Sequence, residues 1–235
     1  GTLDDSKTHK LVLQGLFGTV NRVVSTKQLI DKKQLAQLKV MCLNLKYPEV
    51  EAKKVYGVKY FEELEFLTQN TARNKYIRNL ALALKGNTLL LFQLVEKHGE
   101  ILFNLIKEKA DPKRKVFFVY GGTETDDREK IRAITEKSDN AIIVASFGTF
   151  STGINIRNLH NIVFSSPTKS PIRVLQSIGR GLRVGDKKDS ATVYDISDDL
   201  TYKDKKNFTL THFQERVGIY NREGFNYEIH TVELK

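Results

Sequence analysis

Short apolar runs alternate with longer amphipathic segments through the second half of this chain. The runs are rich in β-branched and aromatic residues and lie at residues 88–92, 116–120, 141–145, 161–164 and 192–196. Such alternation is typical of a parallel sheet flanked by helices. Because parallel strands are joined by right-handed crossovers, we expect one doubly wound α/β lobe over about residues 86–198, with helices on both faces of a mostly parallel sheet.

The segments around these runs carry helix and strand signals of their own. Residues 38–45 read as a strand, and Thr68 or Asn70 can cap a basic amphipathic helix with Arg73 on or near its outer side. Further helices are expected over residues 96–109, from Asp126 or Asp127 to about 137, from 171 to 183, and over 208–220. A strand is expected at residues 225–232, and Asp198-Asp199 is expected to cap the segment that follows it.

Three parts follow from this organisation. Residues 1–37 fit the repeat poorly and are expected to be the tail of an upstream unit with its linker. Residues 38–200 form the lobe, and residues 201–235 add a helix and strand that pack on it. The chain begins with Gly rather than Met, so we expect it to be a fragment.

Composition narrows the possible partners. The 38 Lys and Arg residues exceed the 28 acidic residues, for a formal net charge of +10, which favours a polyanion such as nucleic acid; a solvated basic surface fits the charge equally well. No apolar stretch reaches the roughly 18 residues of a membrane span. Cys42 is the only cysteine and the histidines are scattered, so we expect no disulfide, no metal site and a cytoplasmic location.

The most informative segment is the pattern from Gln176 to Arg183, in which Gly179 precedes Arg180. Arg180 and Arg183 are three residues apart, so both guanidinium groups project from one side of a helix and can converge on one anion. Phosphoryl transfer needs such cations to stabilise charge on the γ-phosphate oxygens. By itself, the pattern is also compatible with two surface arginines in salt bridges.

A hydroxyl-rich segment with two glycines follows the run at residues 141–145. Loops at the carboxyl ends of parallel strands hold the ligand contacts of open α/β sheets. Hydroxyl groups here can donate to phosphate oxygens, and the glycines allow backbone N–H groups to approach them. The hydroxyl residues are Ser146, Thr149, Ser151 and Thr152, and the glycines are Gly148 and Gly153. A Ser/Thr/Gly loop alone is more often simply a loop.

Together these segments resemble the C-terminal, second RecA-like lobe of superfamily 2 helicases. The hydroxyl-rich segment looks like motif V and the arginine segment like motif VI. Residues 88–92 resemble motif IV, residues 119–128 resemble motif IVa, and residues 1–3 are similar to the end of motif III. Residues 150–156, 169–183 and 225–227 most resemble the T4-type phage family of branched-DNA remodelling helicases.

The resemblance implies specific roles. Two lobes would sandwich ATP, with Arg180 and Arg183 reaching its phosphates, Gln176 positioning that contact, and Gly153 and Asn155 near the nucleotide. The implied contacts to DNA are Gln93, Gly121, Gly122, Thr123, Ser146, Thr149 and Ser151. Residues 1–37 would then be a remnant of the first lobe. The intact protein would be a DNA-dependent ATPase that tracks along one strand of branched or forked DNA in recombination and repair, in the host cytoplasm if phage-encoded.

Two departures and one absence qualify this resemblance. Many relatives have Asp where this chain has Asn155, and Ser177 departs from the usual start of motif VI. No G-x-x-x-x-G-K-[ST] phosphate loop and no acidic Mg²⁺-binding box occurs in the sequence. ATP and Mg²⁺ would therefore be held mainly by the N-terminal lobe, the implied partner, and we expect this chain alone not to hydrolyse ATP.

Two other classes of protein stay open on the sequence. One is a non-catalytic nucleic-acid-binding module that keeps a helicase-like fold. The other is the nucleotide-sugar lobe of a glycosyltransferase, which has the same layered architecture.

Overall fold

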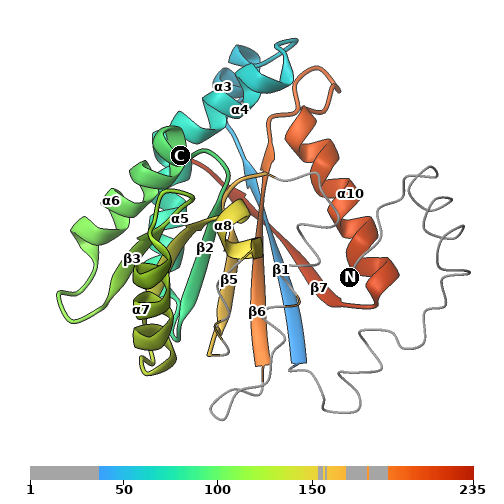
Figure 1. Cartoon of the computed structure of the whole chain (residues 1–235). Coiled ribbons are helices and arrows are strands. Elements are labelled where there is room, and N and C mark those ends of the chain that lie inside the picture. The colour runs from blue at the N-terminus through green and yellow to red at the C-terminus, as the bar shows by residue number, and fades with distance from the viewer. Residues whose placement is uncertain (1–36, 153–155, 157, 168–178, 180–189) are drawn as a thin grey trace, which may run out of the picture.

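A seven-stranded, wholly parallel sheet organises the chain (Figure 1). The computed structural model describes residues 37–152, 156, 158–167, 179 and 190–235. The strand order is β3-β4-β2-β5-β6-β1-β7. The strands are β1 (Gln37–Lys46), β2 (Thr88–Phe92), β3 (Val116–Val119), β4 (Ile142–Ser146), β5 (Asn161–Phe164), β6 (Ser190–Asp199) and β7 (Asn226–Glu233). The predicted parallel sheet is confirmed.

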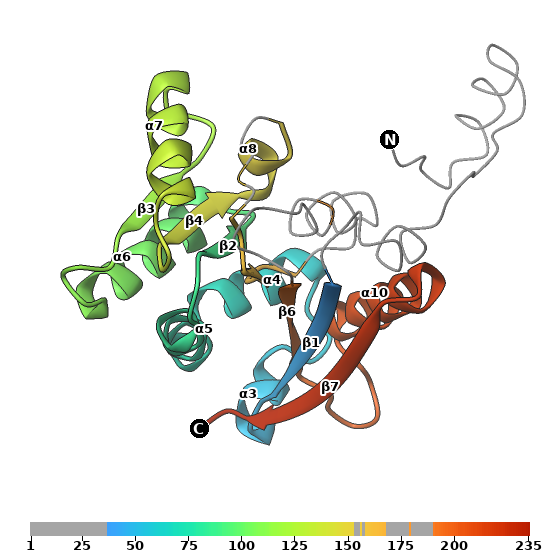
Figure 2. The same cartoon turned by 90° about the horizontal axis from the view of Figure 1, so that it is seen from below.

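Helices cover both faces of this sheet, as expected (Figure 2). The described helices are α3 (Glu49–Lys54), α4 (Tyr60–Gln69), α5 (Thr71–Ala83), the π-helix η1 (Val95–Gly99), α6 (Glu100–Lys109), α7 (Thr125–Glu136), α8 (Phe147–Thr152) and α10 (Phe208–Glu223). Residues from α3 to α6 belong to one apolar core, and residues of α7, α8 and α10 belong to the other. None of the described helices is long and apolar enough to span a bilayer.

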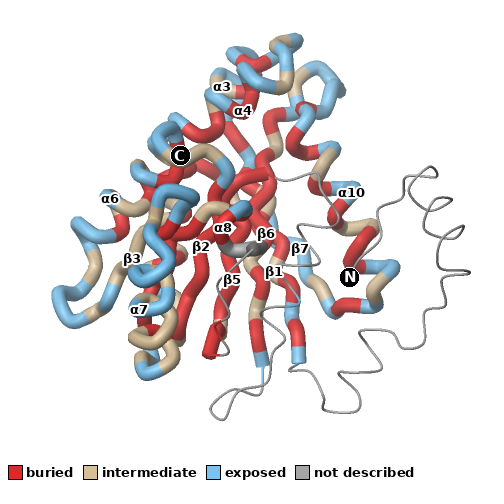
Figure 3. The backbone as a smooth tube through the Cα atoms, viewed as in Figure 1, coloured by how far each residue is buried: buried red, intermediate tan, exposed pale blue. Residues whose placement is uncertain are grey.

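Period-2 alternation along the strands builds these two cores. In β2, Leu89 and Leu91 face one core whereas Leu90 and Phe92 face the other, and all four side chains are fully buried. Strands buried on both faces have near-continuous apolar sequences. For this reason β2 and β4 could be predicted from the sequence. Figure 3 shows the buried strands beneath outer helices that are exposed on one side.

The strands at residues 38–45 and 192–196 are longer than expected. β1 and β6 pair along ten positions, from Gln37 with Ser190 to Lys46 with Asp199. β7 pairs in parallel with the other side of β1, so the C-terminal segment forms an edge strand of the same sheet. Because β1 pairs with a strand on each side, it extends beyond its apolar run into polar residues. A search for apolar runs does not include those residues.

Two local elements differ from the sequence expectations. The hydroxyl-rich segment after β4 begins with a short helix, α8, because Ser146 Oγ accepts the backbone N–H of Thr149 (3.3 Å) and Phe147 is buried against Phe164. The helix expected from residue 96 starts as the π-helix η1. There, a Cβ on Gly99 would come within 2.5 Å of the Phe92 ring, so only glycine allows η1 to lie this close to β2.

The start of α10 is fixed by a carboxylate from another helix. Glu63 of α4 is buried and accepts the backbone N–H groups of Phe208 (2.9 Å) and Thr209 (2.8 Å). These are N–H groups of the first helical turn, which lack partners inside the helix. The predicted helix therefore begins at Phe208. It ends at Glu223 and is capped by Gly224, whose φ is +68°.

Candidate functional site

The carboxyl ends of the strands gather most of the described candidate residues at one edge of the sheet. Gln93 follows β2, the turn at Gly121–Thr123 follows β3, and Ser146 ends β4. Because β3, β4 and β2 are adjacent and parallel, these three positions lie next to one another. The edge brings together residues that lie more than 50 positions apart in the sequence.

The turn after β3 is held by four hydrogen bonds. Thr123 Oγ1 accepts from the backbone N–H of Tyr120 (3.0 Å), and the Thr123 N–H donates to the Tyr120 carbonyl (3.0 Å). Arg128 of α7 donates from Nε to the Thr123 carbonyl (2.8 Å) and from Nη2 to the Gly121 carbonyl (3.0 Å). Gly121 and Gly122 are exposed. The turn is thus a preformed surface that a ligand can approach closely.

The end of β4 has a partly exposed hydroxyl next to a buried one. Ser146 Oγ lies 2.8 Å from Thr149 Oγ1, and Thr149 is only 5% exposed. Thr149 therefore stabilises the start of α8, and the hydroxyl that a ligand can reach is that of Ser146. Phe147 is buried, so its role is packing.

Gln93 connects this edge to β5. Its side chain is exposed, while its backbone N–H donates to Ser166 Oγ (3.1 Å). Ser166 lies just beyond β5, and residues 168–178 follow it. The backbone at Gln93 is therefore tied to the stretch that leads into the arginine segment.

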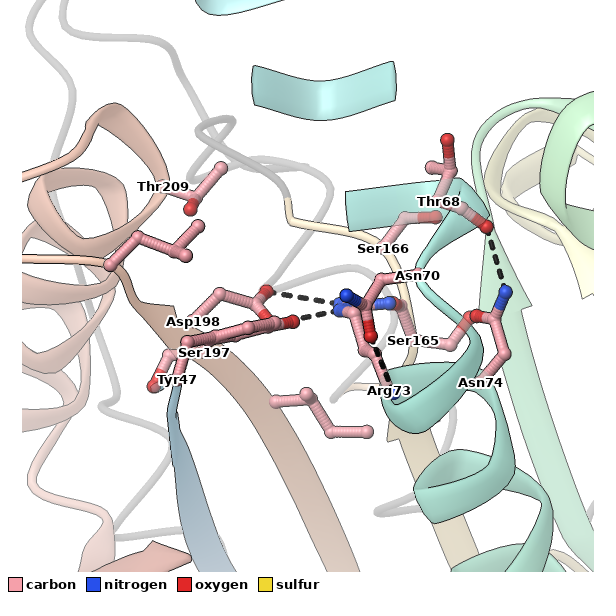
Figure 4. A network of polar contacts seen from close by, with 12 residues as sticks. Tyr47, Thr68, Asn70, Arg73, Asn74, Ser165, Ser166, Ser197, Asp198 and Thr209 are labelled. Atoms are coloured by element: carbon pink, nitrogen blue, oxygen red, sulfur yellow. Dashed lines mark hydrogen bonds and ion pairs between the residues drawn. The ribbon is translucent and has the colours of Figure 1, made fainter. Parts of the chain in front are cut away.

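A buried polar network lies at the carboxyl ends of β1, β5 and β6 (Figure 4). Arg73 Nε donates to Asp198 Oδ1 (2.8 Å), and Nη2 donates to Asp198 Oδ2 (3.1 Å) and to the Ser165 carbonyl (2.8 Å). Tyr47 donates its hydroxyl to Asp198 Oδ1 (2.9 Å). Both members of the ion pair are fully buried. The network joins the ends of β1, β5 and β6 to α5.

Electrostatics keep the guanidinium of this network charged. Burial alone would lower the pKa of the Arg73 guanidinium, but the Asp198 carboxylate more than offsets this and the pKa lies above its ordinary value. Burial and then the Asp198 charge raise the pKa of the Tyr47 hydroxyl well above its ordinary value, so it stays a donor. Arg73 is thus a buried cation that donates its hydrogen bonds to Asp198.

His98 of η1 extends this network to Gln93. Its Nε2 lies 3.5 Å from Arg73 Nη1 and its Nδ1 lies 2.9 Å from Ser166 Oγ. Since the guanidinium can only donate, Nε2 accepts and Nδ1 carries the proton that is donated to Ser166. A continuous chain of contacts therefore runs from Asp198 through Arg73, His98 and Ser166 to the backbone of Gln93.

Sequence reasoning missed this network. The expectation that Arg73 lies on or near the outer side of its helix was wrong, because Asp198 at the end of β6 compensates its buried charge. Asp198 does not cap the segment after it; Asp199 Oδ1 does, by accepting the N–H of Thr201 (3.0 Å). The signal was present in the sequence as an acid two residues after the apolar run at residues 192–196. The expected cap Asn70 is confirmed, since its Oδ1 accepts from the Arg73 N–H (2.9 Å).

The environment of His98 predicts a pH dependence of stability. Burial, and then the Arg73 cation, lower the pKa of His98 well below its ordinary value. Below about pH 6.5 an unfolded histidine takes up a proton that folded His98 does not, so stability is lost as the pH falls through this value. We expect the free energy of unfolding to decrease below pH 6.5 by up to about 1.4 kcal/mol per pH unit more in the unaltered chain than in His98→Gln. Urea unfolding of both proteins across this range measures it; parallel pH profiles would contradict it.

The remaining candidates have no described geometry. Gln176, Arg180, Arg183, Gly153 and Asn155 lie outside the described residues, as does the side chain of Ser151. Within the described part of the chain, no group of three His, Cys, Asp or Glu side chains is arranged to hold a metal ion.

Known proteins are similar to this chain in both sequence and fold. Residues 72–185 match the family described as helicase conserved C-terminal domain. The chain is 37% identical to the ATP-dependent DNA helicase UvsW of Enterobacteria phage T4, over 100% of this chain and 48% of that protein. It is 24% identical to the putative ATP-dependent helicase IRC3 of Saccharomyces cerevisiae, over 72% of this chain and 24% of that protein. The chain thus spans about half the length of the first relative and less of the second.

Solved structures of other proteins have the same fold as this chain. The crystal structure of T4 UvsW superposes with a TM-score of 0.72 at 37% identity, covering 86% of this chain and 42% of that one. A fragment of a putative HsdR subunit of a type I restriction enzyme from Vibrio vulnificus has a TM-score of 0.67 at 16% identity, covering 99% of this chain and 43% of that one. At that identity the second likeness concerns the fold alone.

Proposed function

Because the chain belongs to the helicase conserved C-terminal domain family, with the RecA-like fold of superfamily 2 helicases, we propose that it is the second motor lobe of an ATP-dependent DNA helicase. In this proposal the intact protein remodels branched or forked DNA in recombination and repair, tracks along one strand, and works in the cytoplasm. The observation that carries it is the 37% identity to the phage T4 DNA helicase UvsW over the whole chain.

The nucleotide would lie between this lobe and an N-terminal lobe. Arg180 and Arg183 would reach the triphosphate across the cleft, Gln176 would orient them, and Gly153 with Asn155 would lie near the nucleotide. Hydrolysis of the bound ATP would supply the free energy for the motor. The chain has no phosphate loop, and no metal-binding group occurs among its described residues. The N-terminal lobe would therefore hold Mg²⁺ and most of the nucleotide.

DNA would lie along the carboxyl edge of β3, β4 and β2. The exposed backbone at Gly121 and Gly122 and the Ser146 hydroxyl can donate hydrogen bonds to phosphate oxygens, and Gln93 adds an exposed amide beside them. Opening and closing of the cleft would move this edge relative to the N-terminal lobe. The buried network, which reaches the backbone of Gln93 through Ser166, would keep the geometry of this edge fixed during that movement.

A charge placed in the turn tests the DNA contact. A side chain at Gly121 meets no atom within 4 Å of its Cβ, so Gly121→Glu leaves the fold intact while placing a carboxylate against the phosphates. Since like-charge juxtaposition costs several kcal/mol, we expect the dissociation constant for a fork-shaped DNA to rise by about tenfold or more. Fluorescence anisotropy at fixed salt measures it.

The matched control is Asn104→Glu on the exposed face of α6, which changes the net charge equally. Its affinity for DNA should remain within about twofold of the unaltered chain. Equal affinities for the Gly121 and Asn104 variants would remove the turn from the DNA contact.

A further inference from the structure

A basic groove lies at the opposite edge of the sheet from the candidate site. It has a volume of about 720 Å³ and lies where α6 ends, β3 and β4 begin and α7 ends. Its cationic lining residues are Lys109, Lys113, Arg114, Lys115 and Lys137, against the two acids Asp111 and Asp139. Five positive charges facing two negative ones make this a site of positive potential.

Backbone contacts hold the floor of this groove in place. Arg114 donates to the carbonyls of Leu82 (2.7 Å) and Leu84 (2.8 Å) at the end of α5, and to that of Asn140 (3.1 Å) before β4. The Arg114 N–H also bonds to the Asp111 carbonyl (2.8 Å). Lys113 and Lys115 flank this anchored residue, so their backbone positions are fixed relative to the sheet.

Three of the lysines present their charge to solvent. Lys113, Lys115 and Lys137 are exposed, and within the described residues their ammonium groups form no hydrogen bond or ion pair. Lys109 pairs with Glu108 (3.1 Å). Asp111 accepts the N–H of Lys113 through Oδ1 (2.8 Å), which ties that acid to the backbone rather than to an ammonium group. The ammonium groups are thus available to an external polyanion.

We propose that this groove binds the phosphodiester backbone of a second segment of DNA, distinct from the strand at the carboxyl edge. The two sites lie at opposite ends of β4, whose five residues span roughly 15 Å. The inference rests on the proposed function, because only a substrate with more than one arm offers a second segment to the same lobe. Its chemistry is phosphate neutralisation without recognition of bases.

The test compares the salt dependence of DNA binding by the full chain. One variant carries three changes together, Lys113→Ala, Lys115→Ala and Lys137→Ala. Its binding constant K for a three-armed DNA and for a short single strand is measured at several salt concentrations. With about 0.9 ion released per neutralised phosphate, the slope of log K against log salt for the three-armed DNA should fall in magnitude by about two to three. The slope for the single strand should stay unchanged.

A second triple variant controls for net charge. It changes three exposed lysines that are already paired with acids: Lys39 with Glu228, Lys46 with Glu233, and Lys130 with Asp127. We expect its slopes to match those of the unaltered chain. An unchanged slope for the groove variant, or an equal loss in the control, would overturn the second site. If Gly121→Glu still weakens DNA binding in that case, only the groove is rejected. If the unaltered chain does not bind DNA, both the groove and the proposed function are rejected.

Discussion

Replacing Arg180 with alanine in the protein that carries both lobes is expected to lower the rate of DNA-stimulated ATP hydrolysis by about 10³-fold or more. An arginine supplied across the cleft stabilises charge that develops on the γ-phosphate in the transition state, and alanine removes that cation without changing the DNA-binding edge. The dissociation constant for DNA should therefore stay within about twofold. Phosphate release at saturating ATP and DNA, together with anisotropy, measures both quantities.

Arg183→Ala should act in the same direction, since Arg183 lies one helical turn away in the expected helix. The matched control is Arg222→Ala in the last turn of α10, an exposed arginine outside the candidate site, which should leave turnover unchanged. If both Arg180→Ala and Arg183→Ala retain full turnover, the arginines do not act on the nucleotide and the chain is better described as a DNA-binding module.

Asp198→Ala is expected to destabilise the fold by about 3–5 kcal/mol, because it leaves the guanidinium of Arg73 buried without its counter-charge. Arg73 and Asp198 are both fully buried, and their contact joins α5 to the end of β6. Urea unfolding followed by circular dichroism gives the free energy of unfolding. Replacing both partners with apolar residues, as in Arg73→Met with Asp198→Leu, should recover much of the loss, because no charge is then left unpaired.

The control for this prediction is Glu65→Ala, which breaks the exposed pair of Glu65 with Lys97 at the same 2.8 Å separation. Water already solvates both of these charges, so the unfolding midpoint should not move measurably. Equal effects of Asp198→Ala and Glu65→Ala would mean that burial of the central pair contributes nothing to stability.

The sheet and its two covering layers could be predicted because the strands are buried on both faces and have continuous apolar sequences. Leu89 to Phe92 and Ile142 to Ala145 are examples, with every side chain buried. The turn after β3 and the hydroxyl at Ser146 could be predicted as neighbours, since the carboxyl ends of parallel strands meet at one edge. These inferences need only local pattern and the handedness of crossovers.

Partners distant in the chain could not be predicted. Arg73 looks like a surface cation until Asp198, 125 residues later, is brought against it. Likewise, Glu63 caps a helix that begins 145 residues further on. Helical periodicity reports which side of a helix a residue lies on, but it does not report which charge meets it there. The short helix α8 was missed because its start depends on one capping hydroxyl, at Ser146, rather than on apolar periodicity.

The central claim is that this chain is one half of a motor whose nucleotide is held by two lobes. The most direct test measures ATP turnover, with and without DNA, by this chain alone and by the same chain joined to a lobe that carries a phosphate loop. We predict no turnover above background for the chain alone and DNA-stimulated turnover for the joined protein. Turnover by the isolated chain, or a joined and folded protein that hydrolyses ATP at a rate indifferent to DNA, would contradict the claim.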